Sequence, residues 1–543
     1  MKSLLIHNDN FCHNKNIFER HFKFTGDITN FIKDRLIETS GIDCFVIPIS
    51  LSENYLEFLG IELAYHIRLT KELKDLRFVP IIFFGEETPY LISKLSTLGR
   101  ILYTDGIYVT KGNNIEELLR KKLNGTTQEK IQEQIEFSPP SNYSSHHSVA
   151  NEWSILRWSK YLGIDSRDDF KRLIERIGSS LYYKYLLNKY PIPLIEKGEI
   201  RIEGNGKVLL IDDEYKKGWK IIFKEIFKSG DFKFEVLEQN FEISKDEIVN
   251  SAIRKTEEFD PDIVLLDFRL HTSEFYDTEI DKFTSVEILR KIKVLNPGIQ
   301  VVIFTASNKV WSLHKLESLG ADGFILKESP EFNHDNKFTR ENIKSFRTTI
   351  ENSLCKKYLK EMYSNKNKII EKLNNLRKDK QINKDFQKEM QNLIKLSFQV
   401  LTKQQTNGVY SIAFINLFNS IELIANEYIN EKEPVNKNDK YLYNFYDGTP
   451  VNYYKWEGSY VSKGRLKRDN KTFQLPSYMK IINYAKEKTS MEDYDIYKIE
   501  NLVALRNDYI HQNLVNGSPV RIEKANIEEL FKYVYQLIME IKV

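Results

Sequence analysis

The sequence predicts a multi-domain protein in which two parallel α/β units precede a helical C-terminal part. The chain has 543 residues, and at roughly 150 residues per domain this length suggests three or four domains. Short apolar runs alternate with helical patterns in two separate regions, and this alternation is typical of parallel sheets. Residues 401–543 instead carry long helical patterns.

The composition excludes several classes of protein. Hydrophobic residues make up 41% of the chain and charged residues 29%, so the chain is not disordered over most of its length. Lys and Arg total 80 against 77 Asp and Glu, a formal net charge of +3. This balance gives no whole-chain argument for nucleic acid, a membrane or an acidic ligand. Such a partner has to be sought in local patches.

The cysteines and the apolar runs indicate the compartment. The three cysteines are far apart and form no CxxC pair, which argues against a disulfide framework or a zinc ribbon. The first residues are too short and too polar a stretch for a signal peptide. No run of 18 apolar residues is present. We therefore expect a cytoplasmic protein with no membrane partner.

The first half of the chain contains an α/β unit and a connector. In residues 1–130 the strand candidates are SLLIH, CFVIPI, VPIIFF and GIYVT. Residues 131–204 begin with the linker-like stretch EQIEFSPPSNYSSHHS and continue as helical patterns. Trp153 and Trp158 lie near helical spacing there, and such an aromatic stripe is usually core.

The second half repeats the α/β pattern and then becomes helical. Residues 205–350 carry the strand candidates KVLLIDDE, FEVLE, PDIVLLDF, IQVVIFTAS and GADGFILKE. Residues 351–400 form a helical connector, for which a coiled-coil seam and a solvated helical hairpin both remain open. Residues 401–543 form a helical output domain, interrupted by an irregular Tyr- and Lys-rich stretch at 434–475.

Polar residues follow four of the strand candidates in residues 205–350. Asp212 and Asp213 follow the first, Asp267 ends the third, Thr305 the fourth and Lys327 the fifth. Parallel sheets place their sites at the carboxyl ends of strands. Three carboxylates together need a cation, and oxygen ligands suit Mg²⁺. One carboxylate could then attack phosphorus, while the hydroxyl and the ammonium bind phosphoryl oxygens.

The ordered segments LLIDDE, IVLLDF, VIFTAS and GADGFILKE resemble the receiver domain of response regulators. The resemblance implies a flavodoxin-like fold, with Asp267 as the aspartate phosphorylated by a histidine kinase. It also implies that Asp212, Asp213, Asp267 and the backbone carbonyl of Arg269 bind Mg²⁺.

The same resemblance implies a switch formed by Thr305, Lys327 and Phe324. Two departures from the receiver pattern raise the alternative of a degenerate receiver that binds without turnover. The loop after Asp267 is longer than usual and lacks Pro and Gly, and Lys327 is followed by Glu328 instead of Pro.

Residues 1–130 align with the second unit and resemble a degenerate receiver. LLIHND lies where LLIDDE does, so that His7 and Asn8 replace the acidic pair. Pro48 replaces the phosphoacceptor, Gly85 the threonine and Thr110 the lysine. We expect this unit to serve docking or dimerisation, because its scaffold persists without the site.

The segment LRNDYIHQN places Arg506 and His511 five residues apart on one predicted helix, with Asn507 beside the arginine. Arg can hold a phosphate and His can move a proton near neutral pH. Together with a preceding long helix that contains Glu422, the motif resembles the HEPN superfamily of helical proteins. The resemblance implies a metal-independent ribonuclease with catalytic Arg506, Asn507 and His511 in a site formed across a homodimer, or a non-catalytic binding module.

A basic stretch with aromatic residues at 453–471 is a candidate RNA contact, because it combines phosphate neutralisation with base stacking. Its cationic residues are Lys463, Arg465, Lys467, Arg468 and Lys471.

These expectations combine into a phosphorylation-controlled effector. Phosphorylation of Asp267 would change the geometry of a homodimer and thereby control the C-terminal site. The architecture resembles signalling effectors of prokaryotic defence against phage. The alternatives are a response regulator whose C-terminal helices only dimerise or recruit a partner, and a receiver that drains phosphate from a shared kinase.

Overall fold

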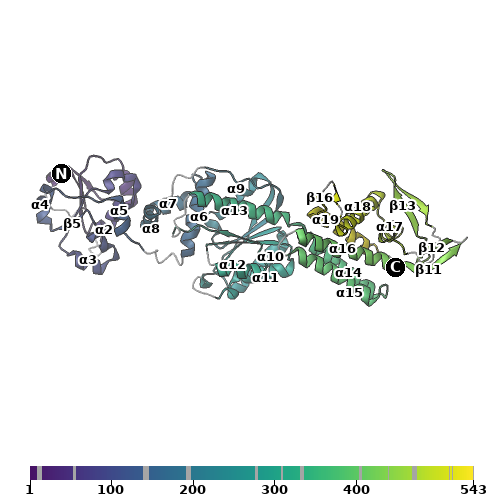
Figure 1. The fold of residues 1–543 in the computed structure, drawn as a ribbon. Helices are drawn as coiled ribbons and strands as arrows, with labels where there is room; N and C mark the ends of the chain where they lie inside the picture. The colour runs from purple at the N-terminus through teal and green to yellow at the C-terminus, as the bar shows by residue number, and fades with distance from the viewer. Residues whose placement is uncertain are drawn as a thin grey trace.

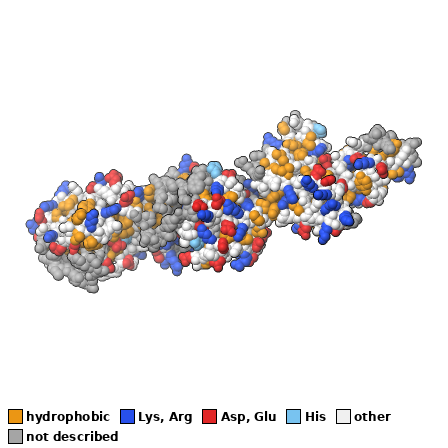
Figure 2. Space-filling view, turned by 90° about the horizontal axis from the view of Figure 1, so that it is seen from below, with side chains coloured by type: hydrophobic (Ala, Val, Ile, Leu, Met, Phe, Trp, Pro, Cys, Tyr) orange, Lys and Arg blue, Asp and Glu red, His pale blue; other side chains and the backbone are white. Residues whose placement is uncertain are grey.

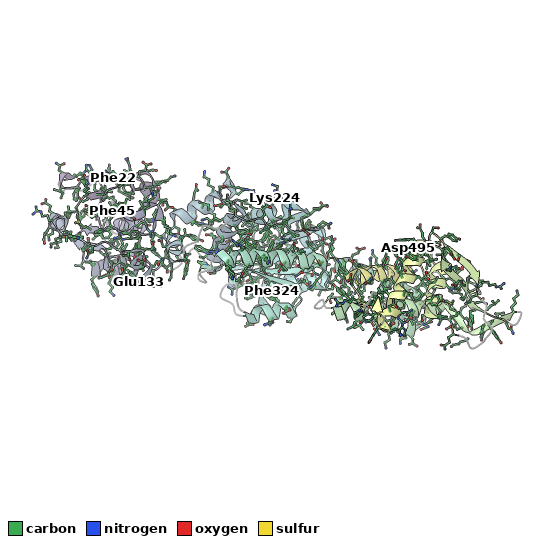
Figure 3. The ribbon with its side chains drawn as sticks, turned by 45° about the horizontal axis from the view of Figure 1, so that its top comes forward. Phe22, Phe45, Glu133, Lys224, Phe324 and Asp495 are labelled. Carbon is green, nitrogen blue, oxygen red and sulfur yellow. The ribbon has the colours of Figure 1, made fainter. Side chains whose placement is uncertain are left out.

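The structure, a computed structural model, forms a row of three parts (Figure 1). Phe45 and Phe324 mark the two sheet-containing parts and Asp495 the helical part (Figure 3). The structure describes residues 1–8, 15–52, 57–137, 146–190, 197–274, 279–306, 310–330, 336–402, 407–437, 440–466, 474–512, 514–515 and 518–541.

The first part contains a five-stranded parallel sheet in the order β2-β1-β3-β4-β5. Its strands are β1 (Ser3–His7), β2 (Arg20–Lys23), β3 (Cys44–Pro48), β4 (Ile81–Phe84) and β5 (Ile107–Thr110). The sequence predicted four of these strands as apolar runs. It missed β2, because this strand lies at the edge of the sheet and its residues RHFK are mostly exposed and polar.

The second part contains a sheet with the same topology, in the order β7-β6-β8-β9-β10. All five predicted strands are present: β6 (Asn205–Ile211), β7 (Asp231–Val236), β8 (Ile263–Asp267), β9 (Gln300–Thr305) and β10 (Gly323–Leu326). They are flanked by α9 (Trp219–Ile226), α10 (Lys245–Phe259), α11 (Thr284–Leu295), α12 (Val310–Ser318) and α13 (Asn336–Cys355). Two flavodoxin-like parallel sheets are thus confirmed.

The connector between the sheets is helical and packs on both of them. It consists of α6 (His146–Leu162), α7 (Asp168–Ser179) and α8 (Leu181–Lys189). In α8, the Lys184 ammonium lies 2.9 Å from both Nδ1 of His66 and Oγ1 of Thr70, at the C-terminal end of α2 (Leu59–Leu69). In α6, Trp158 is fully buried against the second sheet.

Trp158 is the centre of an aromatic cluster. Its ring centroid lies 5.6 Å from Trp219 of α9, 6.2 Å from Phe304 of β9 and 5.5 Å from Phe346 of α13. The three contacts are edge-to-face, the arrangement that aromatic rings favour. The expectation that the tryptophan stripe belongs to the core is confirmed for this residue.

The third part has a mainly helical core. Its helices are α14 (Tyr358–Lys378), α15 (Lys384–Leu401), α16 (Asn407–Tyr428), α17 (Ser477–Lys488), α18 (Asp493–Ile510) and α19 (Lys524–Met539). α14 and α15 form a helical hairpin, one of the two alternatives left open, and its apolar face shares a core with α16–α19.

The sequence predicted an irregular stretch at 434–475. This prediction is wrong for the part of the stretch that the structure describes, which forms paired strands. β11 (Ile429–Lys437) pairs with β12 (Lys440–Phe445), and β13 (Asn452–Trp456) pairs with β14 (Val461–Arg465), both antiparallel. β11 and β14 are rich in polar residues and lack apolar runs, so they carry little strand signal, whereas β12 and β13 contain the aromatic residues that favour strands.

α16 is long and apolar enough, by length and composition, to cross a membrane over Gly408–Tyr428. Half of the residues in this apolar stretch are buried, and α16 packs against α15, α17 and α19. These contacts are those of the central helix of a folded domain. On the face shown in Figure 2, basic and acidic side chains are interspersed along the chain, in keeping with the small net charge.

Replacing Trp158 with alanine is expected to destabilise the second part by about 3–5 kcal/mol, because it leaves a cavity inside the aromatic cluster. Urea unfolding followed by circular dichroism measures this loss. Trp456→Ala is the matched control, since Trp456 is only partly buried and stacks on Tyr497 in the third part. If the unfolding transition of the second part were the same in Trp158→Ala as in wild type, the core role of this residue would be contradicted.

Candidate functional site

Three carboxylates meet at the carboxyl ends of neighbouring strands. Asp212 and Asp213 follow β6 and Asp267 ends β8, and β6 pairs with β8. One oxygen of each lies within 4.8 Å of the others, and Asp212 and Asp267 are fully buried. The sequence placed these residues together because neighbouring parallel strands end at the same edge of the sheet.

Lys327 joins two of these carboxylates. Its Nζ donates hydrogen bonds to Oδ2 of Asp212 at 2.9 Å and to Oδ2 of Asp267 at 2.8 Å. Burial alone would lower the pKa of Lys327, but the two carboxylates outweigh burial and raise it. The ammonium therefore stays charged at neutral pH.

The third carboxylate has an unsatisfied oxygen. Oδ1 of Asp212 accepts the backbone N–H of Glu214 at 2.8 Å, and Oδ1 of Asp267 accepts that of Phe268 at 2.6 Å. Oδ1 of Asp213 is buried and has no hydrogen-bond partner among the described residues. A buried oxygen without a partner is costly.

The charges of the pocket leave room for a cation. Of the three carboxylates, Asp212 and Asp267 form ion pairs with the ammonium of Lys327. Burial and then the neighbouring carboxylates raise the pKa of Asp213 well above its ordinary value. Burial raises the pKa of Asp212 to about 6, with Lys327 opposing the shift. A hard divalent ion would remove both the repulsion and the unsatisfied oxygen, so the residues fit Mg²⁺.

The predicted switch residues flank this pocket. Thr305 is buried at the end of β9, and its carbonyl accepts the backbone N–H of Lys327 at 2.7 Å. Phe324 is partly buried on β10 and pairs with Ile303. Arg269 lies two residues after Asp267, with its guanidinium 5.8 Å from the ring of Phe283. The roles of these residues in switching and metal binding stay predictions.

The long loop after Asp267 is anchored by a residue that the sequence did not indicate. Glu274 is fully buried. Its carboxylate accepts the backbone N–H of Thr284 at 2.7 Å and of Leu270 at 3.3 Å, and it lies 3.1 Å from the ammonium of Lys245. The loop thus reaches the start of α11 without the Pro and Gly of the receiver pattern. Residues 275–278 of this loop lie outside the described residues.

The first sheet lacks this chemistry at the matching positions. Leu4 pairs with Phe45 as Leu209 pairs with Val264. This common register places His7 where Asp212 lies and Pro48 where Asp267 lies.

One of the predicted replacements is wrong. Phe84 pairs with Thr110, whereas the equivalent Phe304 pairs with Ile325. Thr110 therefore corresponds to a position two residues before Lys327. The motif DG that both segments share led the sequence alignment to the wrong register.

In the third part, α18 brings the predicted Arg–His motif against α16. The Arg506 guanidinium lies 3.6 Å from the Glu422 carboxylate, 5.3 Å from the centre of the Phe418 ring and 3.1 Å from Oδ1 of Asn507. His511 is exposed at the C-terminal cap of α18. The arginine is thus held in place, while the histidine is open to solvent.

The basic stretch is only partly described. Lys463 forms an ion pair with Glu487 at 2.6 Å, which reduces its availability to phosphate. Arg465 is exposed on β14. Lys467, Arg468 and Lys471 lie outside the described residues.

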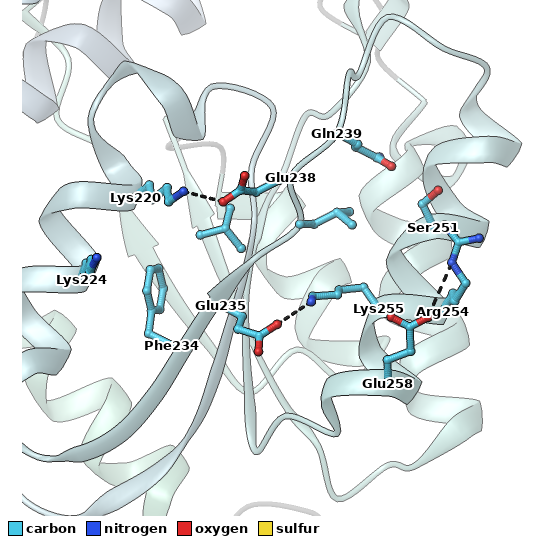
Figure 4. Close-up of a pocket in the computed structure, with 12 residues that line it drawn as sticks. Lys220, Lys224, Phe234, Glu235, Glu238, Gln239, Ser251, Arg254, Lys255 and Glu258 are labelled. Carbon is cyan, nitrogen blue, oxygen red and sulfur yellow. Dashed lines mark hydrogen bonds and ion pairs between the residues drawn. The ribbon is translucent and has the colours of Figure 1, made fainter. Parts of the chain in front are cut away.

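A groove of about 590 Å³ lies away from the acidic pocket, along the edge strand β7 (Figure 4). Lys220 of α9 bonds Glu238 on one side of it, and Lys255 of α10 bonds Glu235 on the other. Arg254 of α10 also lies 4.0 Å from Glu258, so most of the charges that line the groove are paired with one another.

Comparison with known proteins bears on the first part directly. Residues 5–110 match the family model of the inactive receiver domain. The chain begins with an inactive-receiver-like domain. The chain as a whole was also compared with known proteins. Over 117 residues it is 28% identical to sporulation initiation phosphotransferase F of Bacillus subtilis (strain 168), and this match covers 22% of the chain and 77% of that protein. The protein is therefore similar to response regulators.

Solved structures with likeness to this chain include NtrX from Brucella abortus, at 17% identity and a TM-score of 0.21 over 31% of each chain. A LuxR-family two-component response regulator from Aurantimonas sp. SI85-9A1 is 18% identical, with a TM-score of 0.18, over 27% of this chain and 99% of its own. The chain thus spans about a third of the NtrX chain. At these low scores the fold assignment rests on the strand order.

Asp213→Asn is expected to stabilise the metal-free protein at pH 7.5 by about 1–3 kcal/mol, because it removes a partly buried carboxyl group whose ionisation is opposed by burial and by the neighbouring carboxylates. A folded-state pKa of about 6 for Asp212 means that its contribution to stability falls as the pH rises from about 4 to about 6. In Asp213→Asn, this fall in stability between about pH 4 and about pH 6 should be smaller, because a carboxylate next to Asp212 is removed. Thermal unfolding in EDTA across this pH range measures both effects.

In wild type, Mg²⁺ should restore the lost stability, and in Asp213→Asn it should have little effect. Glu257→Gln, an exposed position on α10, is the control. Equal stabilisation of all three proteins by Mg²⁺ would contradict a metal site at these carboxylates.

Proposed function

We propose that the second α/β part is a working receiver that accepts a phosphoryl group on Asp267 from a histidine kinase, in the presence of Mg²⁺. The observation that carries this proposal is the constellation of the buried Asp212, Asp267 and Lys327 with the partly buried Asp213, in which one carboxylate oxygen is unsatisfied. A degenerate receiver would not need to retain so costly a cluster of buried charges.

The chemistry follows from the contacts of Asp267. An oxygen of its carboxylate forms the new bond to phosphorus while the bond from phosphorus to the donor imidazole nitrogen breaks. Bound Mg²⁺ would neutralise phosphoryl oxygens during this transfer. Lys327 already lies 2.8 Å from Asp267, so its ammonium can shift to a phosphoryl oxygen. Thr305, at the end of the neighbouring strand β9, supplies the hydroxyl for another one.

The N-terminal domain serves in this proposal as a docking module, because Pro48 occupies the position of the phosphoacceptor. The whole protein is then a cytoplasmic, phosphorylation-regulated effector that acts as a homodimer. Phosphorylation controls its C-terminal part, in the manner of effectors that respond to phage infection.

Incubation with Mg²⁺ and a small phosphodonor is expected to add one phosphoryl group to the wild-type protein and none to Asp267→Ala. Lys327→Met should slow the addition by about 10²-fold or more, because the electrostatic stabilisation of the phosphoryl oxygens is lost. Intact-protein mass spectrometry measures the product. Pro48→Ala in the first sheet is the control and should behave as wild type. A wild-type protein that stays unmodified while a known receiver is labelled would overturn the proposal.

We further propose that the C-terminal part cleaves RNA with Arg506 as the phosphate-binding residue, Asn507 beside it and His511 as the proton-transfer residue. The supporting observation is that Glu422, Phe418 and Asn507 hold the Arg506 guanidinium in place, while His511 is exposed at the C-terminal cap of the same helix. A second copy of the chain would complete the site.

Mixed RNA incubated with the protein, with and without beryllium fluoride, tests this second function. With Mg²⁺ present in both states, cleavage should occur in one of them and should fall at least 10²-fold in Arg506→Ala and in His511→Ala. Lys524→Ala, on α19, is a control outside the motif. A change of oligomeric state without any cleavage would favour a binding module instead, and no change in either measurement would favour a phosphate-draining receiver.

A further inference from the structure

The connector helix α6 forms a hydrogen bond and an ion pair with Glu328, the residue that follows Lys327. Oγ of Ser154 donates to the backbone carbonyl of Glu328 at 2.8 Å. Nε of Arg157 lies 2.6 Å from Oε2 of Glu328, and both side chains are almost completely buried. Glu328 stands where the receiver pattern has Pro, so the departure from that pattern creates an ion pair with α6.

A third element completes this contact. The hydroxyl of Thr339 in α13 accepts from Nε of Arg157 at 2.9 Å and donates to Oε2 of Glu328 at 2.8 Å. Buried ion pairs contribute little to stability compared with apolar residues of similar volume, and their best-attested use is to fix one arrangement. The pair of Arg157 and Glu328 thus fixes the end of β10 relative to α6.

α6 also touches the other side of the pocket. The side-chain amide of Asn151 donates to the Glu214 carboxylate and its carbonyl accepts from Nε1 of Trp219 at 3.1 Å. The backbone N–H of Glu214 in turn donates to Asp212. One helix therefore contacts the residues that follow both the acidic pair and the lysine.

The apolar face of α6 lies behind the same lysine. Trp158 packs edge-to-face on Phe304, and the ammonium of Lys327 lies 4.8 Å from the centre of that ring. A movement of Lys327 changes this cation–π contact and the packing next to it.

We propose that Arg157 and Glu328 are positioning residues for Lys327, and that through them α6 couples the phosphoryl pocket to the N-terminal inactive-receiver-like domain. This inference rests on the proposed receiver function and adds its regulation. When Lys327 shifts from Asp212 to a phosphoryl oxygen, the end of β10 moves, and the buried contacts of Glu328 pass this movement to α6. The coupling is reciprocal, so a partner that displaces α6 changes the reactivity of Asp267.

The contacts continue from α6 to the first sheet. Glu152 of α6 accepts a hydrogen bond from the hydroxyl of Tyr183 in α8. The next residue of α8, Lys184, contacts His66 and Thr70 at the end of α2. The first part, which lacks a phosphoacceptor, is thereby connected through α8 and α6 to the pocket around Asp267.

The test uses the full-length chain with Mg²⁺ and beryllium fluoride. Fluorine NMR reports whether the pocket is occupied, and hydrogen exchange reports the protection of 149–162 in α6 and of α8. In wild type, occupancy should change the exchange rates of both segments by about threefold or more. In Arg157→Met/Glu328→Met, the pocket should still be occupied, the change in α6 and α8 should vanish, and phosphorylation by a small donor should slow by about tenfold.

Arg167→Met is the matched control, because it removes an exposed arginine–carboxylate pair between the connector and Glu225 of α9. It should keep the wild-type response. Arg157→Lys retains the charge without the planar guanidinium and should recover part of the response, which a general loss of folding would not allow.

Four results would overturn the inference. The first is an occupied pocket in wild type with no change in α6. The second is a double variant that keeps the wild-type response. The third is an Arg157→Lys protein that responds no better than the double variant. The fourth, an unoccupied pocket in wild type, would overturn the proposed receiver function and this inference with it.

Discussion

The site depends on one buried ammonium. Lys327 donates hydrogen bonds to both Asp212 and Asp267, and without it the three carboxylates at the sheet edge would lose the ammonium that joins two of them. Such a cluster is costly to bury, so the surrounding structure has to hold it rigidly. Aromatic residues on β9 and α9, and behind them α6, provide this support.

The contrast between the two sheets shows how far topology and chemistry are separate. Both have the same strand order and nearly the same register. In the first sheet, Pro48 stands where the second has Asp267, and the central strands β1, β3 and β4 remain buried. A parallel sheet is stabilised by the apolar residues of its strands, while the residues just beyond the strand ends decide whether it carries a reaction.

Much of this could be predicted from the sequence. Strands such as IVLLDF are short, apolar and followed by polar residues, so both their existence and the meeting of Asp212 with Asp267 follow from parallel topology. The polar edge strand β2 and the hairpins of the third part could not be predicted, because pairing partners decide their structure. The roles of Glu274 and Arg157 also depend on long-range contacts, and a buried charge looks like a surface charge in the sequence.

The position of Arg157 has a consequence for the order of folding. Its partners Glu328 and Thr339 lie more than a hundred residues later in the chain, so during synthesis α6 emerges long before the groups that neutralise it. Until then α6 would present an uncompensated guanidinium beside the exposed ring of Trp158. The first sheet can close early, but the connector has to wait for α13. The second part is therefore assembled from residues that precede its sheet in the sequence and residues that follow it. It behaves as one unit with α6.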